Sequence, residues 1–444
     1  MTDAPTLSAA RARIDALDDE IAALLKQRLA LVKQAADLKH SSGEGAVSSA
    51  REQAILAHGA ELERKYDLPE HLMQDLQRRI LRHSYVQKGS GAYRAAHFVP
   101  SPEHKQRYGD DNRCRVCIVG GRGGMGRFFE RYLSGAGYLV SIVEVEDYSR
   151  DAQGQTVTDI KQSCAAQRLN AADWVIISVP IAVTDQVIAQ VAPLIRPDCI
   201  LSDLTSIKAR PVKQMLECHV GPVCGLHPMF GPDTFSLVKQ VVVTVNGRNP
   251  ERTAFIGEQL QLLGASVVAC SGEEHDEAMR VIQALRHFTT ISYGNFLREA
   301  FGSQAPSSDA CQTGAAQESP FIARLLELSS PIYHLELMMV GRLFAQDPHL
   351  YCDIISASCS NLKLIAQYVA CAQRCLATLE QADKERFSAD FSATTAFFGK
   401  FARQFLQESS EILALVQDTY PVDAGAAACC GGSAVDSSKE RCGA

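Results

Sequence analysis

Three glycines near the middle of the chain have the spacing of a loop that holds a dinucleotide. Gly121, Gly123 and Gly126 fit the pattern G-x-G-x-x-G between a strand-like run at 115–119 and the helix-like segment RFFERYL. At this spacing the glycines allow a tight turn, a close approach of backbone N–H groups to a pyrophosphate, and close packing of helix on strand. The diphosphate would lie at the helix N-terminus, where unpaired N–H groups and the helix dipole favour negative charge.

An acidic residue follows at the distance that such a site requires. Glu144 stands 18 residues after Gly126, near the end of a second strand-like run, YLVSIVEVE. A carboxylate there would bind the ribose 2′-hydroxyl and repel a 2′-phosphate, which favours NAD over NADP. Strand, helix and acid together favour a dinucleotide site over a merely flexible glycine loop. We expect the cofactor to contact Gly121, Gly123, Met125, Gly126, Glu144, Val179 and Pro180.

A histidine among glycines and prolines is the candidate for proton transfer. His227 lies in GPVCGLHPMFGPD, which we predict to be a loop after a short apolar run. Beside a nicotinamide, histidine is a suitable proton acceptor because its unperturbed pKa is close to neutrality. Without a cofactor, the alternative is a loop histidine that makes a structural hydrogen bond. Ser206 and Lys208 follow another strand-like run and would lie at the same sheet edge as Val179 and Pro180.

Two basic residues share one face of a long helix predicted at 7–40. Arg28 and Lys39 fall within its apolar stripe. They are close to three turns apart, so both leave the same face about 16 Å from each other. A buried charge is costly unless it is paired. Two interpretations stay open: the pair binds one anionic molecule, or the residues pair with acids such as Glu52 or extend to the edge of the stripe.

Hydrophobic periodicity divides the chain into a helical part, a part with alternating strands and helices, and a second helical part. The alternation predicts a doubly wound parallel sheet, in which ligands bind at the carboxyl ends of the strands. The predicted fold class is multidomain: an all-α N-terminal domain, an α/β Rossmann-type dinucleotide-binding domain, and an all-α C-terminal domain. The predicted ranges are 1–88 for the first helical domain, 89–113 for a linker rich in Gly, Pro and charge, 114–272 for the nucleotide domain, 273–421 for the second helical domain with a disordered insertion at 301–319, and 422–444 for a disordered tail.

Composition excludes several classes of protein. A length of 444 residues suggests about three domains, and a net charge of -7 argues against nucleic-acid binding. No apolar run approaches the roughly 20 residues that span a bilayer, and the N-terminus is not a secretory signal. The 15 cysteines are scattered and mostly lie in apolar runs, as expected for reduced thiols in a cytoplasmic protein. The C-x-x-C of Cys114 and Cys117 has no second ligand pair, so we expect no metal site.

Several motifs resemble the bifunctional chorismate mutase/prephenate dehydrogenase family, the T-proteins. These motifs are LSAARARIDALDDEIAALLKQRLALV, Lys39 and AREQ in the N-terminal part, and GLHPMFGPD, QALRHF and GRLFAQDP further on. The resemblance covers roughly residues 7–88 and 114–418, and runs of six or more residues are more specific than a single motif. It implies a Claisen rearrangement of chorismate to prephenate, followed by NAD-dependent oxidative decarboxylation of prephenate to 4-hydroxyphenylpyruvate, in tyrosine biosynthesis.

For the mutase, the resemblance implies a pocket lined by Arg11, Arg28, Lys39, Arg51 and Glu52. The rearrangement needs no nucleophile, but two carboxylates must be clamped and the charge on the ether oxygen must meet a donor. Lys39 would donate to the ether oxygen, and Glu52 would hold the substrate hydroxyl. In the family two intertwined chains share the pocket, and one supplies the arginine that matches Arg11, so a homodimer is implied.

For the dehydrogenase, the resemblance implies that His227 is the catalytic base and that Ser206 orients it. Arg342 corresponds to the arginine that binds the ring carboxylate of prephenate, and His275 to another polar residue of the active site. Lys208, at the same sheet edge, is a further candidate for substrate binding. His227 would accept the proton of the 4-hydroxyl while hydride leaves that carbon for NAD, carbon dioxide departs and the ring becomes aromatic; no metal is required.

Some positions depart from the family pattern. Ser48 stands where related mutases often have Asp, Lys88 where Gln is usual, and His334 where relatives commonly have Arg. These departures keep open a monofunctional prephenate dehydrogenase whose N-terminal helices bind a metabolite without catalysis. Another alternative is a different β-hydroxyacid-type NAD dehydrogenase with a helical appendage. The family also implies a dimer interface in the C-terminal helices and feedback inhibition by tyrosine, and the sequence does not decide between prephenate and arogenate.

Overall fold

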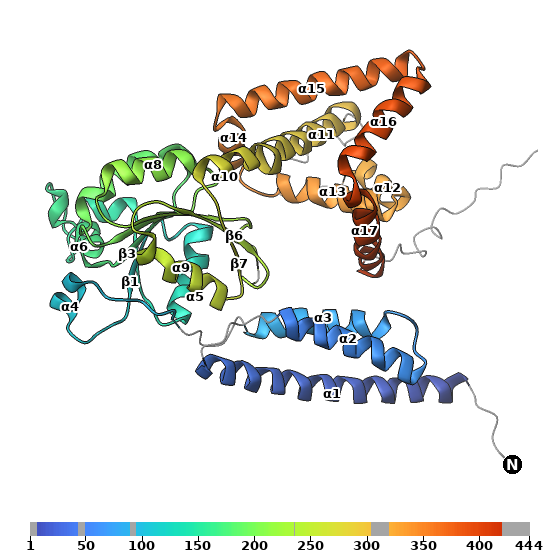
Figure 1. Ribbon diagram of the computed structural model, residues 1–444, viewed down its shortest axis with the longest axis horizontal. Coiled ribbons are helices and arrows are strands. Elements are labelled where there is room, and N and C mark those ends of the chain that lie inside the picture. The colour runs from blue at the N-terminus through green and yellow to red at the C-terminus, as the bar shows by residue number, and fades with distance from the viewer. Residues whose placement is uncertain (1–6, 43–48, 89–94, 235, 303–318, 420–444) are drawn as a thin grey trace, which may run out of the picture. The chain divides into compact units, whose positions relative to one another are not determined.

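The computed structural model describes residues 7–42, 49–88, 95–234, 236–302 and 319–419 (Figure 1). The chain divides into two compact units, Met1–Val281 and Ile282–Ala444. The described part of the first unit holds three N-terminal helices and an α/β domain, and that of the second unit is helical. Most of the insertion predicted at 301–319 and all of the tail predicted at 422–444 lie outside the described residues.

The N-terminal helices are α1 (Leu7–Ser42), α2 (Ser49–Tyr66) and α3 (Leu72–Lys88). These bounds confirm the three helices expected from the sequence. Helix α2 packs closely on α3, because a Cβ on Gly59 would lie 2.4 Å from the side-chain oxygen of Gln77. Glu63 of α2 accepts hydrogen bonds from the amides of Met73 and Gln74 at 2.8 and 3.0 Å. Its carboxylate therefore caps the N-terminus of α3 across the intervening turn.

The α/β domain is built on a seven-stranded sheet of order β2-β1-β3-β4-β5-β6-β7. Its strands are β1 (Arg115–Val119), β2 (Leu139–Val143), β3 (Trp174–Ile177), β4 (Ile200–Asp203), β5 (Val223–Pro228), β6 (Val241–Asn246) and β7 (Ser266–Ala269). Strands β1 to β5 are parallel, as predicted. Strand β6 is antiparallel to β5, and β7 is parallel to β6. This reversal differs from the prediction because the described residues between β5 and β6 form no crossover helix, which a parallel connection requires.

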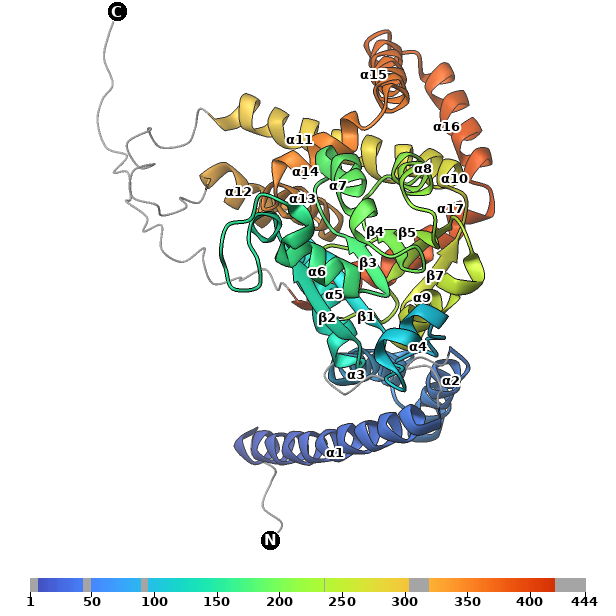
Figure 2. The same ribbon diagram turned by 90° about the vertical axis from the view of Figure 1, so that its left-hand side faces the viewer.

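Helices cover both faces of this sheet (Figure 1 and Figure 2). They are α5 (Gly124–Gly135), α6 (Cys164–Ala171), α7 (Thr184–Val191), α8 (Ala209–Cys218) and α9 (Pro250–Leu262), with short 3₁₀ turns η1 (Val145–Tyr148), η2 (Ile160–Gln162), η3 (Ile181–Val183) and η4 (Ala192–Leu194). Helices α5 and α9 share one core with Val116 and Ile118. Helices α6, α7 and α8 share the other core with Cys117 and Val119. Because neighbouring side chains of β1 enter opposite cores, this strand is apolar from Val116 to Val119.

The segment before β1 belongs to the α/β domain. It contains helix α4 (Pro102–Tyr108), and the side chains of Ala96 and Phe98 enter the sheet core. The structure therefore corrects the boundary predicted near Cys114. Residues 95–113, which were expected to form part of a linker, are packed into the domain.

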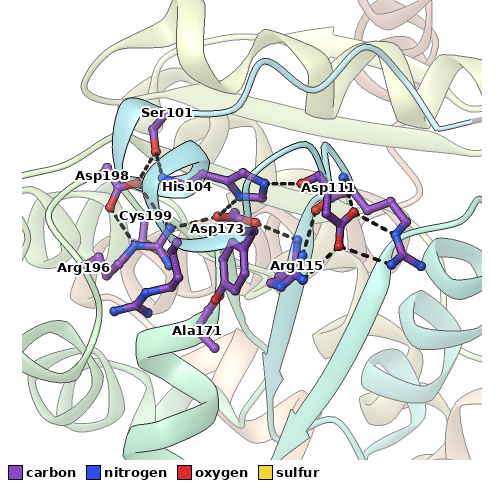
Figure 3. Close-up of polar contacts among 12 residues, drawn as sticks. Ser101, His104, Asp111, Arg115, Ala171, Asp173, Arg196, Asp198 and Cys199 are labelled. Carbon is purple, nitrogen blue, oxygen red and sulfur yellow. Dashed lines mark hydrogen bonds and ion pairs between the residues drawn. The ribbon is translucent and has the colours of Figure 1, made fainter.

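Polar side chains anchor this segment to the sheet (Figure 3). His104 is fully buried, and its Nδ1 lies 2.8 Å from a carboxylate oxygen of Asp173, while its Nε2 lies 2.7 Å from the carbonyl oxygen of Asp111. Arg196 donates to the same Asp173 carboxylate at 2.8 Å, and Ser101 donates to Asp198. Because these anchors are polar, the segment lacks the aliphatic residues that would mark it as core in the sequence.

The remaining helices are α10 (Gly272–Met279), the π-helical η5 (Arg280–Leu285), α11 (Arg286–Phe301), α12 (Pro320–Leu328), α13 (Pro331–Phe344), α14 (Pro348–Ser356), α15 (Cys359–Glu380), α16 (Lys384–Phe398) and α17 (Lys400–Thr419). They confirm the helical pattern predicted from residue 273 onwards. Ser330 and Asp347 each accept a hydrogen bond from the first turn of the helix that follows, and proline comes next. Such Ser-Pro and Asp-Pro steps are helix starts because proline needs no N–H partner in the first turn.

No helix in the described part of the chain is long and apolar enough to cross a membrane. Within the same residues, no group of three or more His, Cys, Asp or Glu side chains is placed to hold a metal ion. Cys114 and Cys117 enter different cores on opposite faces of the sheet, so this C-x-x-C does not form a pair of metal ligands. The cysteines that the structure describes are free thiols.

Candidate active sites

The loop between β1 and α5 makes close contacts that its glycines permit. Gly120 directly follows β1 with a φ of 77°, and a Cβ there would lie 2.4 Å from the carbonyl oxygen of Ser178. A Cβ on Gly126 would lie 2.5 Å from the Cα of Gly121, so helix and loop approach each other through two glycines. The left-handed turn therefore falls on Gly120, one residue before the predicted motif, and the Gly120-Gly121 pair was the signal in the sequence.

The N-terminus of α5 is the point at which the sequence predicts a bound diphosphate. The helix begins at Gly124, and its N-cap residue, Gly123, has no side chain that could bond to the amides of the first turn. The first-turn amides and the helix dipole thus favour an anion at this point. Val179 lies against the same loop, and Pro180 follows as an exposed residue. Met125 is partly buried against the sheet core.

Glu144 follows β2, and its carboxylate lies at the glycine loop. Its Oε1 accepts a hydrogen bond from the amide of Arg122 at 2.6 Å. Glu144 and Asp147 also form a capping box, in which each side chain accepts from the backbone amide of the other. The carboxylate of Glu144 therefore lies beside the glycine loop, and its contact with a ribose hydroxyl stays a prediction.

His227 is buried near the end of β5, with 2% of its surface exposed. The loop predicted around it is wrong, because the strand continues past its glycine and pairs with β6. His227 Nδ1 lies 2.8 Å from His275 Nε2, and His275 Nδ1 lies 2.7 Å from Asp276 Oδ1. The structure thus brings His227 and His275 together and adds Asp276. The sequence reasoning missed this carboxylate, although it is next to His275 in the motif EEHD.

The carboxylate of Asp276, at the end of this chain of hydrogen bonds, determines which ring nitrogens of His275 and His227 carry protons. An ionised Asp276 only accepts hydrogen bonds, so His275 donates from Nδ1 and, while neutral, accepts at Nε2. His227 then donates from Nδ1, which leaves the lone pair of the neutral ring on Nε2. Asp276 is itself held by the backbone amides of Lys208 and Ala209, at 2.7 and 3.0 Å.

The surroundings of His227 and Asp276 shift their pKa values towards the charge states that this chain of hydrogen bonds requires. Burial lowers the pKa of His227 well below its ordinary value, and the charges of Lys208 and His275 lower it further. Burial raises the pKa of Asp276, but hydrogen bonds from His275 and from two backbone amides outweigh that effect and leave the pKa below its usual range. At neutral pH His227 is therefore neutral and Asp276 is ionised.

Lys208 and Ser206 were both predicted to lie at the carboxyl edge of the sheet, near the substrate. Lys208 is fully buried, and its ammonium pairs with the carboxylate of Asp203 and lies 3.4 Å from Thr205 Oγ1. The full burial of Lys208 and its pairing with Asp203 give no support to a direct substrate contact, and the substrate-binding role suggested for Lys208 stays a prediction. Ser206 is half-buried after β4, and among the described residues His227 Nδ1 bonds to His275 and not to Ser206.

In the N-terminal helices, α1 and α2 bring two arginines near each other. Arg28 is half-buried, and burial and the charge of Arg51 both lower its pKa. Its Nη1 is buried and has no hydrogen-bond partner among the described residues. Two neighbouring guanidinium groups with an unsatisfied N–H are suited to an anionic group such as a carboxylate.

The other residues predicted for this pocket are distributed along the same helices. Glu52 is half-buried on α2, and Arg11 is exposed near the start of α1. Lys39 lies in the last turn of α1, Lys88 ends α3, and Ser48 lies outside the described residues. The roles that the sequence suggested for these side chains stay predictions.

In the second unit, α13 carries both Arg342, which is exposed, and His334, which is half-buried. The sequence reasoning passed over His287 in the motif QALRHF. Its ring packs edge-on against Tyr351 of α14, with ring centroids 4.8 Å apart. Burial, together with the charge of Arg286, lowers the pKa of His287 to about 4. The ring is therefore neutral at neutral pH.

Comparisons with known proteins match two parts of the chain to family models and most of its length to known relatives. Residues 130–269 match the family model of the prephenate dehydrogenase nucleotide-binding domain, and residues 10–88 match chorismate mutase type II. The T-protein of Enterobacter agglomerans is 42% identical over 415 residues, which cover 94% of this chain and 99% of that protein. The chain belongs to the T-protein family.

Another T-protein, from Haemophilus influenzae, is 38% identical over 409 residues, which cover 92% of this chain and 96% of that one. Among solved structures, prephenate dehydrogenase from A. aeolicus in complex with hydroxyphenyl propionate and NAD⁺ aligns with a TM-score of 0.45 and 16% identity, over 68% of this chain and 99% of that chain.

As a T-protein, this chain is a bifunctional enzyme with chorismate mutase and prephenate dehydrogenase activities. Its dehydrogenase uses NAD, as the glycine motif predicted. The match to a mutase family over the N-terminal helices favours the bifunctional prediction over helices that only bind a metabolite. The match to the prephenate dehydrogenase nucleotide-binding domain, together with the T-protein relatives, disfavours the alternative of a different β-hydroxyacid-type NAD dehydrogenase with a helical appendage.

Proposed function

We propose that His227 is the base of the dehydrogenase reaction and that His275 and Asp276 hold it in place. The observation that supports this role is the hydrogen-bond chain from Asp276 through His275 to His227, at 2.7 and 2.8 Å. This chain leaves the His227 lone pair on Nε2, and the lowered pKa keeps the ring neutral before the reaction. A base must be in this state to accept a proton.

The reaction then follows from the chemistry of prephenate. Bound NAD supplies the acceptor for the hydride that leaves C4. His227 Nε2 takes the proton of the 4-hydroxyl, the ring loses its carboxylate as carbon dioxide, and the proton becomes available to the phenolate oxygen of 4-hydroxyphenylpyruvate. While His227 is protonated, the charge of Asp276, acting through His275, stabilises the imidazolium.

We place the dinucleotide along the loop from Gly120 to Gly126, with its diphosphate at the N-terminus of α5 and its adenosine ribose at Glu144. The uncapped first turn of α5 and the carboxylate beside the loop support this placement. From the family resemblance, we assign the ring carboxylate of prephenate to Arg342. Ser206, next to the same sheet edge, keeps the orienting role that the resemblance suggests.

For the mutase we propose that Arg28 and Arg51 bind substrate carboxylates, that Lys39 donates to the ether oxygen and that Glu52 holds the hydroxyl. The buried, unsatisfied Nη1 of Arg28 supports an anion at this position. Such a clamp would hold chorismate in its reactive conformer, which is the main requirement of a rearrangement without proton transfer.

We further propose a homodimer that shares this pocket. Arg11 stands 17 residues before Arg28 on the same helix, which is about 25 Å along the axis and beyond the reach of two extended side chains. The apolar stripe between them is exposed: Ile14, Leu17, Ile21 and Leu24 keep 51–62% of their surface in solvent. A second copy would cover this stripe and receive Arg11. Contacts between the C-terminal helices, feedback inhibition by tyrosine and a cytoplasmic location are proposed from the resemblance and the free thiols.

A sequential assay tests these assignments. Purified protein is given chorismate, whose loss of absorbance is followed, and NAD is added later to follow NADH. We expect His227→Asn to remove about three orders of magnitude from NADH formation while the mutase rate stays that of the wild type. Arg28→Ala should have the reverse effect, with NADH still formed from added prephenate. NADH formation near the wild-type rate in His227→Asn would exclude His227 as the base.

A further inference from the structure

The end of strand β2 carries charges of both signs beside the glycine loop. The guanidinium of Arg122 pairs with Glu146 at 2.7 Å, and that of Arg168 pairs with Asp147 at 3.0 Å. Glu144 accepts a hydrogen bond from the Arg122 amide at 2.6 Å. Three carboxylates and two guanidinium groups thus belong to the contacts at the end of β2, where we propose that the adenosine ribose binds.

Arg122 is an unexpected residue for a site that takes NAD. An arginine beside the ribose is the usual partner of a 2′-phosphate, because its planar fork binds phosphate oxygens bidentately. The backbone of Arg122 is fixed against Glu144, the acid proposed to bind the 2′-hydroxyl. The loop therefore holds one residue that suits NADP directly next to one that suits NAD.

The ion pair with Glu146 explains how a loop that carries Arg122 can still favour NAD. Arg122 and Glu146 are 63% and 54% exposed, so their ion pair adds little to the stability of the fold. It nevertheless occupies Nη1, one arm of the guanidinium fork that a phosphate would use. Glu146 also adds a second negative charge near the ribose, which repels a phosphate dianion.

We propose that Glu146 is a specificity-determining residue, which keeps a 2′-phosphate out of the site by holding Arg122 and by its own charge. Discrimination between NAD and NADP then depends on Glu146 as well as on Glu144. This inference rests on the proposed position of the adenosine ribose at Glu144.

Calorimetric titration of the full-length protein with 5′-ADP and with 2′,5′-ADP tests the inference without turnover. The variants are Glu146→Gln, Arg122→Gln and the double variant. Glu217→Gln is the matched control, because Glu217 is an exposed glutamate that pairs with Lys213 on α8 at 3.9 Å, in the same domain. Steady-state kinetics with prephenate and either NAD or NADP provide a second readout.

In Glu146→Gln, we expect the ratio of the dissociation constant of 2′,5′-ADP to that of 5′-ADP to fall about fivefold. The ratio of kcat/KM with NADP to kcat/KM with NAD should rise by a similar factor. The gain should disappear in the double variant, and Glu217→Gln should show none. An unchanged ratio in Glu146→Gln, or a gain that persists without Arg122, overturns the inference. A wild-type protein that binds neither nucleotide overturns the proposed dinucleotide site itself, so the two failures are distinguishable.

Discussion

At the scale of single residues, the neutral state of His227 sets the pH range of the dehydrogenase. Burial, Lys208 and His275 lower its pKa, so the ring keeps its lone pair below the ordinary value of about 6.5. We expect kcat/KM for prephenate to fall only as the pH drops through this lowered pKa, and to be level between about pH 6.5 and neutrality. Initial rates of NADH formation over a pH series measure the profile. An acid limb with its midpoint above 6.5 would contradict the argument.

Asp276 should affect the same reaction through the proton positions as well as through its charge. An asparagine can turn its amide N–H towards His275 Nδ1, which would reverse the order of donors and acceptors along the chain. The lone pair of His227 would then be on Nδ1 instead of Nε2. We expect Asp276→Asn to lower the kcat of the dehydrogenase about 100-fold, with a much smaller change in the KM for prephenate and in the mutase rate.

The control for Asp276→Asn is Glu273→Gln, because Glu273 is an exposed carboxylate on the same helix, α10. Both changes replace an acid by its amide, but only Asp276 contacts His275. If the kcat values of the two variants agree within about threefold, His227 needs no orientation by a carboxylate and the proposed role of Asp276 is wrong.

At the scale of elements, the sequence predicted the structural elements that depend on neighbouring residues. The apolar run of β1 and the glycine spacing after it identified the strand, the turn and the helix, because each depends on neighbouring residues. The strand around His227 escaped prediction because β6, its partner across the antiparallel pair, determines it. The anchor of His104 also escaped, because Asp173 is 69 residues away. The sequence made Lys208 a candidate for substrate binding, and only its contact with Asp203 shows why it is buried.

The polar anchor of the segment before β1 allows a test of its contribution. Asp173 accepts from His104, from Arg196 and from the backbone amide of Arg115, each at 2.8 Å. Asp173→Asn leaves the buried guanidinium of Arg196 with one fewer charged partner. We expect the free energy of unfolding of the α/β domain to fall by about 3 kcal/mol. Urea unfolding followed by the fluorescence of Trp174, the single tryptophan of the chain and buried next to Asp173, measures the change.

Glu217→Gln serves again as the comparison, because it removes one carboxylate from an exposed ion pair. Its effect on the same unfolding transition should stay within about 0.5 kcal/mol. A loss for Asp173→Asn that is no larger than this would mean that the segment 95–113 is held by the apolar contacts of Ala96 and Phe98 alone.

At the scale of the whole molecule, a single chain leaves its longest helix incompletely covered. The stripe of α1 that the sequence suggested would be buried is exposed, and Arg11 at one end cannot reach the Arg28 of its own helix. Both observations have one explanation if α1 lies against a second copy of the chain. The periodicity of the sequence correctly identified the apolar face, but it could not indicate whether the face belongs to a core or to an interface.

Two defective variants of the mutase distinguish these possibilities. Arg11→Ala removes the arginine that a chain supplies to the pocket of its partner. Arg28→Ala removes an arginine from the pocket of the chain itself. Either variant alone should therefore have little mutase activity. In a mixed dimer, the pocket of the Arg11→Ala chain receives Arg11 from the Arg28→Ala chain and is complete. Random pairing of equal amounts makes half of the dimers mixed, with one complete pocket of two, so co-expression should restore about a quarter of the wild-type rate. If Arg11 served its own chain, every pocket would lack one arginine and co-expression would restore no mutase activity. NADH formation from prephenate should continue with either outcome, because neither variant changes the dehydrogenase.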